Sequence, residues 1–162
     1  MAYPIVLAKR CAHENIDAFN RSAKAESALN NGAAVTLAWA TDGYCFTASA
    51  ASTISGAFWM ALSPEVNKAV IGSVYGGADP RYFRNEAGRP FDVVKLVDGD
   101  VLQVTADFFS GTPEVGKTAV LTSGAWTVGT TSSGARFAIV QAEPIVVGME
   151  RVPAWNIEFH EA

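Results

Sequence analysis

Alternating apolar and polar positions dominate the chain after Gly32 and predict a succession of β-strands. In residues 33–40, Val35, Leu37 and Trp39 occupy every second position, which is the period of a strand with one buried face. We expect further strands over residues 44–47, 70–75, 91–97, 101–109, 115–121, 126–130, 136–141 and 155–159. Glycine, serine and aspartate clusters separate many of them at the spacing of antiparallel sheets.

The connections between these strands carry their own signals. Asp98-Gly99-Asp100 separates two apolar runs, and Asp-Gly favours the positive φ angles of a tight hairpin, so we expect residues 91–97 and 101–109 to pair. Residues 48–55 and 76–90 read as loops, and Ser63-Pro64-Glu65 as the start of a short helical turn. Prolines interrupt the tail, so the last strand is expected at a sheet edge. Three tryptophans lie in apolar patterns and are expected in the core: Trp39, Trp59 and Trp126.

The first thirty residues do not show this alternating pattern. Residues 1–10 read as an N-terminal arm, because Pro4 prevents an early helix and an apolar extended segment follows. Residues 11–31 are helix-like and end at Asn30-Asn31-Gly32, a stop signal. We therefore expect a single domain over residues 1–162, with a β-rich core over 32–162. The fold class is mainly β: a small antiparallel β-barrel or β-tulip-like domain with an N-terminal arm and one or two short helices.

Charge and composition limit the classes of partner that the protein is expected to bind. The net charge is -4, and the basic residues nearest one another, Arg81, Arg84 and Arg89, are interleaved with acidic ones. This pattern lacks the basic stripe that neutralises phosphates, so no nucleic-acid partner is expected. No apolar run approaches the roughly 18 residues of a membrane span, so no membrane partner is expected either. Only 17% of residues are charged, and a surface with few charges leaves room for apolar patches that bind partners.

One motif suggests nucleotide chemistry. Residues 111–118 read Gly-Thr-Pro-Glu-Val-Gly-Lys-Thr, which matches the phosphate-binding pattern GxxxxGK[ST]. That pattern binds phosphate only where a helix follows it, because the helix N-terminus supplies N–H donors and a favourable dipole. Only four residues separate Thr118 from Ser123-Gly124, and they favour a strand. Pro113 also removes one donor. We therefore expect a surface turn that binds no nucleotide.

Other chemical groups are scattered. The two histidines, His13 and His160, lie near opposite ends of the chain, and no His or Cys pair has metal-ligand spacing. Cys11 and Cys45 are either free thiols or a single disulfide. No nucleophile, base and orienting group can be matched, so we expect no enzymatic activity, no cofactor and no metal.

The arm and one tryptophan are the candidate protein-interface residues. An apolar extended arm is usually ordered by pairing with a sheet, either its own or that of another chain. Its alternate side chains Tyr3, Ile5 and Leu7 would then give specificity, and we expect the arm to be removable without unfolding the domain. Trp155 lies in the short last strand, where burial in the chain's own core is least assured, and tryptophan is favoured at interfaces.

Residues 58–137 resemble tailed-bacteriophage capsid decoration (cement) proteins. The likeness is one of texture: small residues, glycine turns, a Gly-Asp turn and a Val-Gly-Lys turn that leads into a strand. It rests on residues 58–64, 79–81, 87–91, 99–101, 104–105, 116–117 and 124–126. The resemblance implies a virion structural protein that binds the outer capsid surface and bridges capsid subunits, using an N-terminal arm as a clamp. It implies the major capsid protein as partner, self-association as a homotrimer, and a place on the virion after assembly in the host cytoplasm.

Two alternative functions are also compatible with the sequence. One is a carbohydrate-binding or adhesion module of a virion or cell surface, which requires exposed coplanar aromatic rings. The other is nucleotide binding through residues 111–118.

Overall fold

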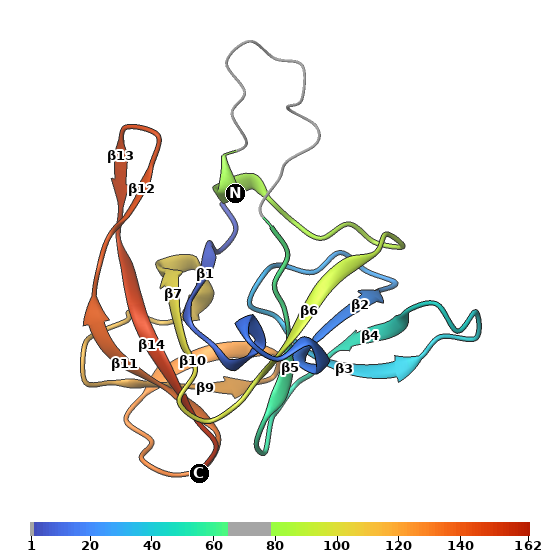
Figure 1. The fold of residues 1–162 in the computed structure, drawn as a ribbon. Helices are drawn as coiled ribbons and strands as arrows, with labels where there is room; N and C mark the ends of the chain where they lie inside the picture. Colours follow the sequence, from blue (N-terminus) through green and yellow to red (C-terminus); the bar gives the residue numbers. More distant parts are fainter. Residues whose placement is uncertain (1, 65–78) are drawn as a thin grey trace.

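The computed structural model describes residues 2–64 and 79–162, and in these residues the fold is mainly β with short helical turns (Figure 1). The fold class predicted from the alternating pattern is confirmed. Two strand systems lie next to each other in Figure 1, one on the side of the C-terminal strands and the other around β2 to β6. The chain enters the first system, builds the second, and then returns to the first.

The larger system is a seven-stranded sheet. Its spatial order is β1 (Val6–Arg10), β7 (Val101–Thr105), β14 (Ala154–His160), β11 (Arg136–Ala142), β9 (Thr118–Thr122), β10 (Ala125–Gly129) and β8 (Phe109–Ser110). All neighbours are antiparallel except β10 and β8.

The smaller system is a ring of five strands in which each strand pairs with two others. Around the ring these are β2 (Asn20–Lys24), β4 (Phe46–Ala50), β3 (Ala34–Trp39), β5 (Phe58–Ala61) and β6 (Phe91–Leu96). The pairing is antiparallel except between β2 and β4. A separate hairpin is formed by β12 (Ile145–Val147) and β13 (Glu150–Val152), and short 3₁₀ turns are η1 (Ala12–Glu14), η2 (Asp17–Phe19), η4 (Pro80–Tyr82) and η5 (Ala106–Phe108).

A cluster of buried aromatic rings joins the two strand systems. Phe58 of β5 lies 5.6 Å from Trp126 of β10 and 5.1 Å from Phe159 of β14, measured between ring centroids. Phe137 of β11 lies 4.8 Å from Trp126. The ring strand β5 therefore contributes to the core of the large sheet, and the core is continuous across the two systems. The core position predicted for Trp126 is confirmed, since its exposed fraction is 4%.

The prediction of a helix-like stretch over residues 11–31 is mostly wrong. Only η1 and η2 are helical there, and residues 20–24 form strand β2. The sequence pattern favoured a helix because small and polar residues predominate, but its apolar stripe is too thin to stabilise one. The backbone of Asn20–Ala23 pairs instead with β6, a long-range contact that local composition does not reveal.

The predicted hairpin around Asp98-Gly99 is also wrong in its pairing. Gly99 has a φ of 87°, as a tight turn requires, but β6 pairs with β2 and β5, whereas β7 pairs with β1 and β14. The turn carries the chain from the ring to the large sheet. It is fixed by the buried Asp100 carboxylate, which accepts hydrogen bonds from the backbone N–H groups of Val97 and Ala12 at 2.9 and 2.8 Å.

Other expectations have mixed outcomes. The strand predicted over residues 155–159 is present as β14. It lies between β7 and β11 rather than at the predicted sheet edge. The strand expected over 44–47 is present as β4, which pairs with β3 and continues through residues 48–50 that were expected as loop. Trp59 is only half-buried, and Trp39 is exposed. The helical turn at Ser63-Pro64-Glu65 and the strand over 70–75 fall wholly or partly outside the described residues.

Candidate functional site

Among the residues that the structure describes, the most exposed aromatic surface lies at the end of the β3–β4 hairpin, which projects from the ring in Figure 1. We call Trp39, Tyr44 and Phe46 the aromatic tip. Trp39 is 72% exposed and Tyr44 is 93% exposed. Trp39 and Phe46 face each other across the two strands, with ring centroids 4.3 Å apart and planes tilted by 31°. Large aromatic side chains are seldom left so open without a partner to cover them.

The exposure of Trp39 follows from the way β3 leaves the ring. Val35 is buried inside the ring, Leu37 is half-buried and Trp39 is exposed. These residues lie on the same face because side chains alternate along a strand. The apolar face of β3 therefore continues beyond the part of the ring that can cover it.

Polar contacts hold the tip in shape. Tyr44 donates its backbone N–H to Asp42 Oδ1 at 3.0 Å, closing a turn at the end of the hairpin. The guanidinium of Arg21 on β2 lies 5.6 Å from the centre of the Phe46 ring, within range of a cation–π contact. Lys24 approaches Asp42 at 4.0 Å. The aromatic tip is thus an ordered surface with an arginine beside it.

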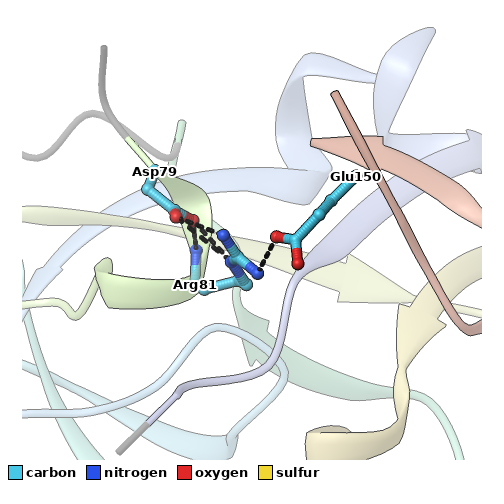
Figure 2. Close-up of polar contacts among 3 residues, drawn as sticks. All are labelled: Asp79, Arg81 and Glu150. Atoms are coloured by element: carbon cyan, nitrogen blue, oxygen red, sulfur yellow. Dashed lines mark hydrogen bonds and ion pairs between the residues drawn. The ribbon is translucent and has the colours of Figure 1, made fainter. Parts of the chain in front are cut away.

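A second apolar projection is the end of the β12–β13 hairpin, where Val146 is 66% exposed and Met149 is fully exposed. Figure 2 shows how this hairpin is braced. Arg81 of η4 donates to Glu150 at 2.6 Å and to both carboxylate oxygens of Asp79 at 2.7–3.1 Å. Hydrogen bonds from Arg81 hold the pKa of Asp79 below its usual range. The cluster ties the η4 turn to the β12–β13 hairpin.

The interface residues predicted from the sequence are not brought together as one exposed surface. Ile5 is buried, Tyr3 is half-buried and Leu7 is 38% exposed. Strand β1 pairs with β7, and Ile5 is held through Thr105. The arm therefore belongs to the chain's own sheet and core. Trp155 is half-buried in central strand β14, with its ring 6.3 Å from that of Phe109.

The alternating pattern of β3 placed Trp39 in the core, so the aromatic tip was not predicted. The signal was present, since Trp39 and Tyr44 flank the predicted turn at 41–43. A strand residue next to a turn lies at the end of a sheet, where its cover depends on how far the neighbouring strands extend.

The phosphate-binding pattern at residues 111–118 is not followed by the helix that phosphate binding requires. Thr118 begins strand β9 rather than a helix. The Lys117 ammonium pairs with Glu114 at 3.0 Å, and the Thr118 hydroxyl donates to the Thr131 carbonyl at 2.9 Å. The helix N-terminus that would attract phosphate is absent from this part of the structure.

Other reactive groups are separated or occupied. Cys11 and Cys45 are free and buried. Burial, with the nearby Asp100 and Glu14 carboxylates, raises the pKa of Cys11 to about 12, which disfavours the nucleophilic thiolate. Over residues 2–64 and 79–162, no group of three or more His, Cys, Asp and Glu side chains is placed to hold a metal ion.

Two adjoining grooves lie along the ring strand β6. One of about 600 Å³ runs between β1 and strands β2 and β6. The other, of about 490 Å³, lies beside η4 and is lined by tyrosine, arginine and acidic side chains. Ser63, Pro64 and Asp92 line both.

The fold and these surfaces define a mainly β protein with projecting apolar hairpins. No family model, no curated protein and no solved structure matches the chain. Among the helices of the described ranges, none is long and apolar enough to cross a membrane.

Proposed function

We propose that the protein is a non-catalytic structural module that binds other protein chains through the aromatic tip. Its proposed partner is the major capsid protein on the outer surface of a bacteriophage capsid, which it stabilises by bridging capsid subunits. The resemblance described above supplies the capsid, the virion location and self-association as a homotrimer. The exposure of Trp39 and Tyr44 is the observation that carries the binding role.

The composition of the aromatic tip supports a protein partner. Tryptophan, tyrosine and arginine are the residues that contribute most often to binding hot spots. Here Trp39 and Tyr44 are exposed and Arg21 lies against Phe46. Covering such a surface removes apolar area from water at a small entropic cost, because the Trp39 ring is already packed on one side.

The carbohydrate-binding alternative gains less support at this surface. The exposed coplanar rings expected for that alternative are not formed by Trp39 and Phe46, whose planes are tilted by 31°.

The test is co-sedimentation of the purified protein with empty expanded capsids. The wild-type protein should pellet with the capsids. Trp39→Ala combined with Tyr44→Ala should weaken binding by at least about 30-fold, which corresponds to the ~2 kcal/mol of a hot-spot truncation.

The matched control is Tyr82→Ala, which removes an aromatic ring that is 57% exposed and lies outside the aromatic tip. It should bind capsids as the wild-type protein does. Thermal melting should show all variants folded, because the removed rings are mostly exposed. Capsid binding that survives loss of Trp39 and Tyr44, or no capsid binding by the wild-type protein, contradicts the proposal.

A further inference from the structure

The groove beside η4 has the walls of a small-ligand site, and we call it the η4 pocket. Its volume of about 490 Å³ falls within the range of ligand pockets, roughly 300–1,000 Å³. Tyr3, Tyr82 and Phe83 contribute aromatic walls, and charged side chains of both signs lie among them.

Tyr82 presents the open ring. It is 57% exposed and follows Arg81, whose side chain is fixed by the ion pairs of Figure 2. The other tyrosine, Tyr3, carries the Arg84 guanidinium 5.4 Å from its ring centre, and its backbone N–H donates to the Arg81 carbonyl at 2.7 Å. One side of Tyr3 is therefore covered, whereas Tyr82 is available to stack with a ligand.

Asn85, which lines the pocket, is held in place by a network of buried amides. Asn85 is 4% exposed, and its Nδ2 donates to the Leu29 carbonyl and to Asn31 Oδ1, each at 3.1 Å. Asn31 in turn exchanges two hydrogen bonds with the backbone of Ser63. Asn85 Oδ1 accepts no hydrogen bond although it is buried. This oxygen is enclosed and does not face a ligand, so the role of the amide network is to hold the Asn85 segment in place.

The charges around the pocket balance. Arg84 and Arg89 oppose Glu86 and Asp92, and Arg89 pairs with Glu86 at 2.8 Å. Within the described residues, the Asp92 carboxylate takes part in no hydrogen bond or ion pair, although its backbone N–H bonds the Ser63 hydroxyl. The open polar groups are therefore the acceptor on Asp92 and the remaining N–H donors of the two arginines.

The polar and aromatic groups that line the pocket indicate which class of ligand fits it. A phosphate or carboxylate ligand would face Asp92 without a surplus of positive charge. An apolar ligand would desolvate Asp92 and leave it without a hydrogen bond, at high cost. A neutral molecule with hydroxyl groups and a flat C–H face satisfies both the polar groups and the Tyr82 ring.

We propose that the η4 pocket binds a neutral saccharide. The sugar ring stacks on Tyr82, its hydroxyls donate to Asp92, and Arg84 and Arg89 donate to its oxygens. This site uses none of the residues of the aromatic tip, so it stands or falls independently of the proposed capsid binding.

The experiment begins with the full-length protein on an array of neutral oligosaccharides of hexoses and N-acetylhexosamines, with sulfated and sialylated glycans as the acidic set. The best neutral binder is then titrated by calorimetry against the wild-type protein and its variants. Tyr82→Ala should weaken its affinity by about threefold to tenfold, from the loss of an aromatic contact. Asp92→Ala should weaken it by at least about tenfold, from the loss of a charged acceptor.

Trp39→Ala is the matched control, since it removes an exposed ring elsewhere and should leave glycan affinity unchanged. Circular dichroism confirms that each variant is folded, and amide NMR shifts on titration should cluster at residues 82–92. Three results would overturn the proposal: no neutral glycan bound, binding confined to acidic glycans, or full affinity retained by both pocket variants. Loss of capsid binding in Trp39→Ala with intact glycan binding would separate the two proposals.

Discussion

Gly32 lies where the ring meets the large sheet, and its replacement by alanine tests how tightly the two are joined. Its φ is 89°, its N–H donates to the Ala61 carbonyl at 2.8 Å, and its carbonyl accepts from the Trp126 indole at 2.9 Å. A Cβ added here would lie 2.7 Å from two ring carbons of Phe108 and 3.1 Å from Val6. Alanine is therefore expected to be strained both in its backbone and in its contacts.

The magnitude follows from these two causes. Positive φ costs a residue with a Cβ about 1–2 kcal/mol. Overpacking in a core that cannot relax costs a further 1–3 kcal/mol or so, and Phe108 is buried in the aromatic cluster and stacked on Trp126. Gly32→Ala should lower the free energy of unfolding by about 2–5 kcal/mol.

Gly99→Ala is the matched control, because Gly99 has a φ of 87° but no atom within 4 Å of its added Cβ. It carries the backbone cost without the contact cost. Urea unfolding of both variants, followed by tryptophan fluorescence, should show Gly32→Ala less stable than Gly99→Ala by about 1–3 kcal/mol. Equal destabilisation by the two substitutions would refute the claim that Gly32 is closely packed against Phe108.

Three other predictions follow from the described contacts. Deleting residues 1–10 should unfold the protein or destabilise it by more than about 3 kcal/mol, because Ile5 and Val6 are buried; an unchanged circular dichroism melting curve would contradict this. Because burial raises the Cys11 pKa from 9.0 to about 12, its protonated thiol stabilises the fold fully below about pH 9, and this contribution is lost towards pH 12. Unfolding measured across that range should show a smaller decline in Cys11→Ser, and parallel curves would count against it. Calorimetric titration with ATP or GTP and magnesium should give no heat of binding, and binding abolished by Lys117→Ala would overturn that expectation.

Local sequence signals predicted strands better than their partners. The alternation in residues 33–40 and the apolar runs at 91–97 and 136–141 correspond to β3, β6 and β11, because a half-buried strand imposes its period wherever it lies. The Asp98-Gly99 turn was correctly placed, but its hairpin was not. A turn sequence fixes a backbone angle, whereas strand pairing depends on residues far away in the chain.

The candidate surfaces were less predictable still. The arm was expected to pair with a sheet of its own chain or of another chain, because apolar extended termini need a sheet, and the sheet is β7 of the same chain. Trp39 was assigned to the core because it continues the apolar face of Val35 and Leu37. Whether such a face is covered depends on the ends of neighbouring strands, which the pattern in one strand does not contain.

The sequence by itself determined the mainly β class, the turn at Gly99 and the lack of context for phosphate binding at residues 111–118, since period, φ preference and helix length are local properties. Only the tertiary structure decided that β2 replaces a helix, that β14 lies inside the sheet and that Trp39 is exposed. It also brought Tyr3, Tyr82 and Asp92 to one pocket from three separate segments. These features depend on long-range pairing and on burial, which arise only when distant segments compete for the same core.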